Sequence, residues 1–86
     1  MSEIQEKFNN AQQRVKTLPK TPDNNTLLEL YALYKQGTTG DVSGKRPGML
    51  DIKGRAKYDA WAGRKGMSRE DAMSAYVALV DRLVGA

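Results

Sequence analysis

Tyrosine and lysine side chains recur together at helical spacing in two parts of the sequence. Tyr31 and Lys35 are four residues apart with Tyr34 between them, and Lys53 and Lys57 repeat the four-residue spacing further along the chain. Residues at i and i+4 of an α-helix share one face. A lysine ammonium is a good partner for phosphate, and a tyrosine offers a flat ring for a base to stack on. Two such helices around a common cleft would form a pocket for a phosphorylated nucleotide.

Each of these patterns also has a purely structural interpretation. Lysines four apart are typical of a solvated helix face, and tyrosines at helical spacing are typical of a half-buried core. Trp61 is interpreted as a core anchor, and Tyr76 belongs to an apolar stripe. Lys16 suits the negative end of the first predicted helix. From the residues alone, the sequence indicates a small basic helical protein able to bind a phosphorylated ligand, and no more.

The composition excludes several kinds of chemistry. The 86 residues contain no cysteine and no histidine. The usual thiol nucleophile, the commonest general base and the commonest zinc ligands are therefore absent. A thioesterase or acyltransferase would lack an activated nucleophile, so we expect no catalysis, no metal and no cofactor.

The net charge of +4 leaves nucleic acid open as an alternative partner. A nucleic-acid-binding helix would be rich in Arg and Asn, but here the tyrosines and lysines are divided between two helices, and no helix-turn-helix spacing is found. We therefore expect no nucleic-acid binding.

The sequence also bears on location and organisation. No apolar stretch approaches the roughly 20 residues that a membrane span needs, and residues 1–7 lack the apolar core of a signal peptide. We expect a cytoplasmic monomer without stable membrane insertion, folded as a single domain over residues 1–86.

Capping signals predict two helices in the first half of the chain. Ser2, with Gln5 three residues later, forms a capping box in front of an apolar repeat of helical period. Thr21 is predicted to cap the second helix, with Pro22 at its first position, and that helix is expected to continue to about Gln36.

Glycines and a proline interrupt the helical pattern over residues 37–50, which predicts a long loop. Asp51 is predicted to cap a third helix that runs to about Arg64, with Gly66 as its C-cap. Ser68 begins the fourth helix, which carries a clear apolar stripe. No segment alternates with period two, so the predicted class is all-α.

In these segments the sequence resembles the acyl-CoA-binding protein family. Residues 31–41 read Tyr-Ala-Leu-Tyr-Lys-Gln-Gly-Thr-Thr-Gly-Asp, and residues 46–51 read Arg-Pro-Gly-Met-Leu-Asp. Both runs follow the family signature in order, and residues 55–61 and 68–77 continue the similarity. Gly37 replaces the family's usual Ala, which is expected to loosen the end of the second helix. Tyr58 replaces a Trp.

The resemblance implies a four-helix up-down-down-up bundle that binds and transports long-chain acyl-CoA in the cell, without catalysis. It implies that Tyr31 stacks on the adenine while Lys35 and Lys57 hold the 3′-phosphate of the ribose. The other positions that match the family's ligand contacts are Tyr34 in the same pocket, Lys16 and Lys53 at the head group, Tyr76 near the acyl end and Leu28 in the acyl groove.

Overall fold

The computed structural model describes residues 2–85, and these residues form helices and loops without a strand. The predicted all-α class is therefore confirmed. Within this part of the chain, no helix is both long enough and apolar enough to cross a membrane. The elements in chain order are α1 (Glu3–Arg14), the short 3₁₀-helix η1 (Val15–Thr17), α2 (Asn24–Thr38), α3 (Ile52–Ala62) and α4 (Arg69–Gly85).

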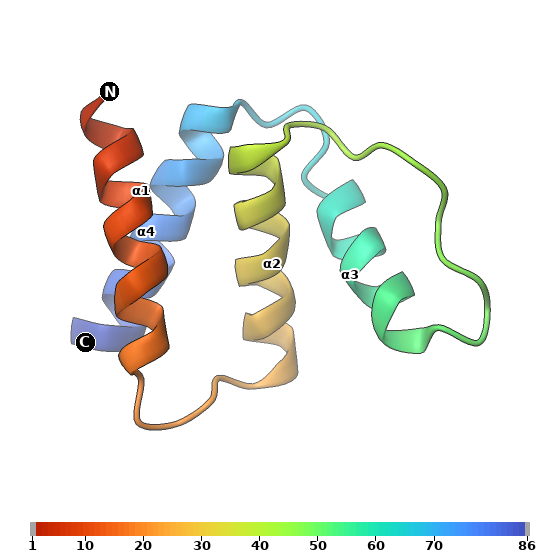
Figure 1. Ribbon diagram of the computed structural model, residues 1–86, viewed down its shortest axis with the longest axis horizontal. Helices are drawn as coiled ribbons and strands as arrows, with labels where there is room; N and C mark the ends of the chain where they lie inside the picture. Colours follow the sequence, from red (N-terminus) through yellow and green to blue (C-terminus); the bar gives the residue numbers. More distant parts are fainter. Residues whose placement is uncertain (1, 86) are drawn as a thin grey trace.

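In Figure 1, α1 runs down, α2 and α3 run up and α4 runs down; viewed from the other end, this is the up-down-down-up order that the resemblance implied. Helix α2 stands between α4 and α3, and α1 packs on α4. Helices α2 and α3 are parallel, because the crossover of residues 39–51 returns along the length of the molecule before α3 begins. This arrangement leaves α3 packed along α2 at one side of the bundle.

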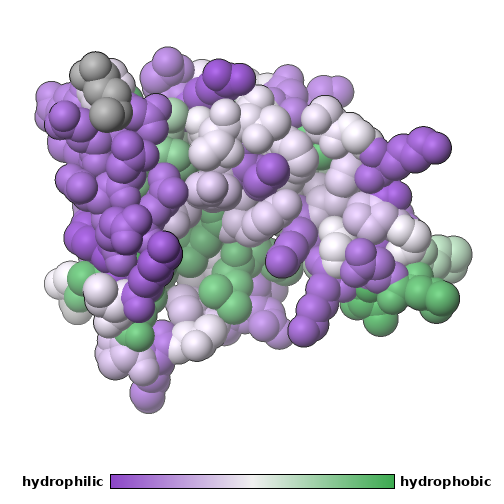
Figure 2. All heavy atoms as spheres, viewed as in Figure 1, coloured by the Kyte–Doolittle hydropathy of each residue, from purple (hydrophilic) through white to green (hydrophobic). Residues whose placement is uncertain are grey.

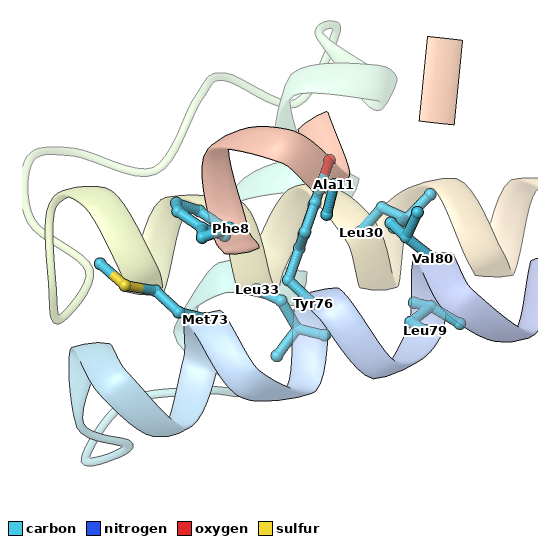
Figure 3. Close-up of a cluster of buried hydrophobic side chains, with 8 residues drawn as sticks. All are labelled: Phe8, Ala11, Leu30, Leu33, Met73, Tyr76, Leu79 and Val80. Atoms are coloured by element: carbon cyan, nitrogen blue, oxygen red, sulfur yellow. The ribbon is translucent and has the colours of Figure 1, made fainter. Parts of the chain in front are cut away.

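The core lies between α1, α2 and α4 (Figure 3). Its apolar side chains recur at intervals of three and four along each helix, so each helix turns one stripe inward. Phe8 is fully buried and meets Tyr76 edge-on, with ring centroids 5.1 Å apart. The buried cluster comprises Phe8, Ala11, Leu30, Leu33, Met73, Tyr76, Leu79 and Val80.

Short polar side chains start the helices at three of the four predicted positions. The Ser2 hydroxyl accepts from the backbone N–H of Gln5, and Asp51 and Ser68 make the equivalent contacts before α3 and α4. These contacts satisfy backbone donors that have no partner within the helix.

The predicted cap of the second helix is wrong. Asp23, not Thr21, caps α2: its backbone is extended and its carboxylate accepts from the backbone N–H of Thr26 at 2.8 Å. An aspartate is at least as good an N-cap as a threonine, so the later residue sets the helix start and Pro22 stays outside the helix.

Two helix ends also differ from the prediction. Helix α2 continues past Gln36 to Thr38, and Gly40 then adopts a positive φ of 94°. Helix α3 ends at Ala62 rather than near Arg64. Gly66 does have the left-handed backbone expected of a C-cap, but it lies in the connection to α4.

Gly37 lies inside α2 and is buried. A Cβ at this position would lie 3.2 Å from both the Phe8 ring and the Met73 side chain. The glycine therefore makes room for the Phe8 ring and lets α4 approach α2 closely, and it does not end the helix as its position in the sequence suggested.

The crossover begins at a buried polar contact. The fully buried Gln36 side chain donates to the Asp41 carboxylate at 2.9 Å and to the Met67 carbonyl at 2.8 Å. The same carboxylate accepts from the backbone N–H of Gly66 at 2.9 Å. These bonds join the end of α2 to the connection between α3 and α4.

Further bonds fix the crossover along its length. Trp61 donates from its indole nitrogen to the Gly40 carbonyl at 2.8 Å. Further on, the Tyr58 hydroxyl donates to the Gly44 carbonyl at 3.0 Å. The Arg46 guanidinium binds the Asp59 carboxylate in a bidentate manner: Nε donates to Oδ1 at 2.8 Å and Nη2 donates to Oδ2 at 2.6 Å. The side chains of α3 thus hold the loop that precedes it.

We expect Asp41→Asn to lower the free energy of unfolding at pH 7. The N–H of Gly66, followed by the Gln36 amide, lowers the pKa of the Asp41 carboxyl from its ordinary value. The contribution of this lowered pKa is fully present above the unfolded value of about 4, and it is lost as the pH falls through the lower folded value.

The deficit of Asp41→Asn should therefore shrink between pH 5 and pH 2, measured by urea unfolding at a series of pH values. Asp81→Asn is the matched control, because it removes an exposed carboxylate that pairs with Arg14 at the surface. An equal deficit for Asp41→Asn at pH 7 and pH 2 would contradict the assignment.

Candidate functional site

The first groove lies between η1, the connection to α2 and the first half of α2, and we call it the η1–α2 groove. It encloses about 390 Å³. Tyr31 and Tyr34 line it from α2 and Tyr76 from α4, while Lys16 lines it from η1 and Lys20 from the connection to α2. Its remaining lining residues are Val15, Leu18, Thr21, Pro22, Leu27 and Leu30.

The second groove lies between α2 and α3 and is called the α2–α3 groove. It encloses about 460 Å³. Leucines of α2 face Ile52 and Ala56 of α3 across it, with Lys53 and Lys57 beside them. The remaining lining residues are Asn24, Leu27 and Leu28. Because Leu27 lines both grooves, the two are neighbours on the same helix.

A cation–aromatic contact connects the two grooves. The Lys57 ammonium, from the α2–α3 groove, lies 5.5 Å from the centre of the Tyr31 ring, which lines the η1–α2 groove. One turn further along α2, the Lys35 ammonium lies 4.8 Å from the centre of the Trp61 ring. Tyr31 and Lys35 thus each meet a side chain of α3, and the face they share is the one that packs toward that helix.

Three aromatic rings, those of Phe8, Tyr34 and Tyr76, are packed together at the wall of the η1–α2 groove. Tyr34 lies 6.1 Å from Phe8 and 6.5 Å from Tyr76, measured between ring centres. Tyr76 is buried, and this burial, with a smaller effect of Tyr34, raises the pKa of its phenol above the ordinary value. Tyr76 therefore stays neutral and keeps its hydroxyl proton at physiological pH.

The lysines of both grooves lack acidic partners. Within residues 2–85, the ion pairs are Glu3–Lys7, Arg14–Asp81, Arg46–Asp59 and Glu29–Arg64. None of them involves a groove lysine, and no acidic side chain lines either groove. The positive charge at the grooves is therefore not neutralised by the chain and favours an anionic ligand.

The structure divides the predicted site residues between the two grooves. Lys16, Tyr31, Tyr34 and Tyr76 line the η1–α2 groove. Leu28, Lys53 and Lys57 line the α2–α3 groove. Lys35 lines neither groove and lies over Trp61.

The structural interpretation of two aromatic residues is confirmed as well. Trp61 is buried between α2 and α3, and Tyr76 is part of the core cluster. Tyr76 nevertheless reaches the η1–α2 groove, so its two interpretations do not exclude each other.

Sequence reasoning missed some lining residues. Lys20 adds a cation to the η1–α2 groove from the loop between η1 and α2, where no helical spacing indicated it. Ile52 and Ala56 share the four-residue spacing of Lys53 and Lys57, so the same pattern could have placed them on this face. Leu27 lies four residues before Tyr31 and could have been found in the same way.

The two grooves offer complementary chemistry. One combines tyrosine rings with lysines and suits a flat, negatively charged group, and the other adds aliphatic side chains that suit a hydrocarbon. In residues 2–85, no three His, Cys, Asp or Glu side chains gather where they could hold a metal ion.

Comparison with known proteins identifies relatives over almost the full chain. The family model described as "Acyl CoA binding protein" matches residues 5–80. The Acyl-CoA-binding protein homolog 1 of Caenorhabditis elegans is 53% identical over 77 residues, which cover 90% of each chain. The Acyl-CoA-binding protein homolog of Manduca sexta is 50% identical over 82 residues, which cover 94% of this chain and 91% of that protein.

Solved structures agree with these relatives. The crystal structure of Oryza sativa Acyl-CoA-Binding Protein 2 is similar with a TM-score of 0.89 and 45% identity, covering 93% of this chain and 87% of that one. The crystal structure of ACBP from Moniliophthora perniciosa is similar with a TM-score of 0.84 and 36% identity, covering 100% and 86% of the two chains. The four-helix arrangement is shared with both.

We expect Trp61→Phe to lower the free energy of unfolding by about 1–3 kcal/mol, because it leaves the partly buried Gly40 carbonyl without its donor and reduces the packed area between α2 and α3. Urea unfolding followed by circular dichroism measures this, since the chain has a single tryptophan and the variant has none.

Tyr58→Phe is the matched control for Trp61→Phe. It also removes a bond from an aromatic side chain of α3 to a crossover carbonyl, but that bond is exposed. The expected cost is below about 1 kcal/mol, because water replaces an exposed donor. Equal losses for the two variants would contradict the role given to Trp61.

Proposed function

Because this chain belongs to the acyl-CoA-binding protein family, as the resemblance of its sequence indicated, we propose that it binds and carries long-chain acyl-CoA in its two neighbouring grooves. The observation that carries this proposal is the contact between Lys57 and Tyr31, which joins a cationic aromatic groove to a groove with aliphatic walls. An acyl-CoA has the same division between a charged nucleotide and a hydrocarbon chain.

The nucleotide part of the ligand is assigned to the junction of the grooves. Tyr31 offers its ring to the adenine, and Lys35 and Lys57 offer ammonium groups to the 3′-phosphate of the ribose. The Lys57 ammonium, from α3, lies against the Tyr31 ring, and Lys35 lies one turn after Tyr31 on α2. An ammonium has three donors, so a ring on one side leaves donors free for phosphate oxygens.

The acyl part of the ligand is assigned to the α2–α3 groove, which Leu28 lines. Burial of each methylene is worth about 0.8 kcal/mol, so a chain of about sixteen carbons offers on the order of 10 kcal/mol before the cost of ordering it. The acyl chain therefore supplies much of the affinity, and the head group supplies the specificity.

The ligand is proposed to bind in a folded shape. Lys16 and Tyr76 line one groove, although the resemblance assigns Lys16 to the head group and Tyr76 to the acyl end. Lys53 and Leu28 line the other groove with the same division of roles. A ligand that touches all four residues must bring its head group back over its acyl chain.

The finer properties of the protein are part of the same proposal. We assign it a carrier role without catalysis, in the cytoplasm, as a monomer that consists of a single acyl-CoA-binding domain. The family is one of binding proteins, and the grooves are lined by side chains that bind and shield rather than by a nucleophile with its base.

We expect Lys35→Ala to weaken the binding of every acyl-CoA by a similar factor, about 10- to 100-fold, because the phosphate that it contacts is common to all chain lengths. Calorimetric titration with acyl-CoAs of several lengths measures this. Lys7→Ala is the control, because Lys7 pairs with Glu3 on α1 and lines neither groove. An effect confined to one chain length would show that Lys35 does not hold the phosphate.

For Leu28→Ala, in contrast to Lys35→Ala, we expect the loss of affinity to depend on the acyl chain. Loss of apolar contact is expected to weaken a long-chain ester by about 5- to 10-fold and to leave free CoA nearly unchanged. The same titration series tests this, with Val84→Ala as a control outside both grooves. Equal weakening of free CoA and the long-chain ester would remove Leu28 from the acyl-binding wall.

A further inference from the structure

Three large apolar side chains are almost fully exposed at the start of α3. Met49 is 82% exposed, Leu50 is 99% exposed and Ile52 is 77% exposed. The other exposed large apolar residues, such as Leu27 and Val84, are only 40 to 42% exposed. We call residues 49–52 the apolar corner. Contact with water at such side chains is unfavourable, and their grouping indicates a binding surface.

The apolar corner projects from the molecule. It spans the end of the crossover and the first residue of α3, on the side away from α1 and α4 (Figure 1). The space-filling view shows a cluster of hydrophobic atoms at this corner of the molecule (Figure 2). Three side chains on a convex turn offer far less area than the roughly 800 Å² per partner of a stable protein interface. Their shape suits insertion into a soft surface.

The charges around the apolar corner are mostly positive and free. Lys45 and Lys53 are exposed on either side of it in the sequence. Of the nearby acidic groups, Asp59 is paired with Arg46, and the negative charge of Asp51 is offset in part by the positive end of the α3 dipole, at which it caps the helix. Apolar side chains flanked by free lysines are suited to a membrane interface that carries anionic lipids.

The apolar corner is continuous with the α2–α3 groove. Ile52 belongs both to the apolar corner and to the lining of that groove, and Lys53, the next residue, lines the groove as well. A surface on which the corner docks would therefore lie at the open end of the groove.

We propose that the apolar corner is a reversible docking site for anionic lipid bilayers. Met49, Leu50 and Ile52 enter the interfacial region, and Lys45 and Lys53 lie against lipid phosphates. The benefit for ligand transfer rests on the proposed carrier function, since the groove would open at the membrane from which an acyl-CoA is taken. Docking itself requires no acyl-CoA.

The first test measures the partition of the ligand-free protein onto vesicles of phosphatidylcholine with and without phosphatidylserine, by co-sedimentation. We expect binding that requires phosphatidylserine and falls at least about tenfold in Met49→Ser/Leu50→Ser, because two apolar anchors are lost. Neither residue lines a groove, so titration with palmitoyl-CoA should give wild-type affinity for this variant. Val84→Ser is the matched control and should keep wild-type partition.

A second test uses the absence of cysteine from the chain. Leu50→Cys and Val84→Cys each accept an environment-sensitive fluorophore at one site. With phosphatidylserine vesicles, the label at position 50 should shift to the blue and the label at position 84 should not. This result depends on a gain of signal, so it does not rely on the stability of the double variant.

Three results would overturn the docking site. They are no partition of the wild-type protein onto phosphatidylserine vesicles, equal partition of Met49→Ser/Leu50→Ser, or equal spectral shifts at positions 50 and 84. A wild-type protein that does not bind palmitoyl-CoA in the titration would instead refute the proposed function. The two failures are therefore measured separately.

Discussion

The buried side chain of Gln36 is the point at which three segments of the chain meet. Its amide donates to Asp41 at the start of the crossover and to the Met67 carbonyl before α4. Helix α3 lies between these two segments in the sequence and packs on α2 in space. Its position therefore depends on how both of its connections are held. Because a buried amide that loses its partners costs about 1–3 kcal/mol, this contact stabilises one arrangement of the connections against others.

The grooves follow from that arrangement. Residues of α2 supply walls to both, while only the position of α3 brings Lys57 to Tyr31 and Lys35 to Trp61. The lysines that line the two grooves have no acidic partners within residues 2–85, and their mutual repulsion costs some stability. A bound polyanion would relieve that repulsion.

Much of this fold could be predicted from local sequence. Ser2, Asp51 and Ser68 were identified as caps because a short polar side chain before an apolar repeat acts on its own helix. The cap at Asp23 was missed because Thr21 and Asp23 offer the same chemistry two residues apart. Gly37 was misread because its reason, close approach to Phe8 and Met73, lies in residues distant in sequence.

The site could be predicted in composition but not in arrangement. Spacing of four along a helix placed Tyr31 with Lys35 and Lys53 with Lys57, but no spacing shows how two helices face one another. The division into two grooves, and the contribution of Lys20 from a loop, are properties of the packed chain. The family resemblance supplied roles for these residues that residue chemistry alone could not give.

The one-sided packing of α3 has a consequence for evolution. The three-helix core of α1, α2 and α4 contains no buried residue of α3. Substitutions of Ile52 or Ala56 on α3 therefore alter the lining of the α2–α3 groove without replacing a residue of that core. Ile52 and Ala56 differ in this respect from Leu30 and Tyr76, which belong both to the core cluster and to the lining of the η1–α2 groove. The shape of the α2–α3 groove can therefore change by substitutions in one helix while the core of the other three stays constrained.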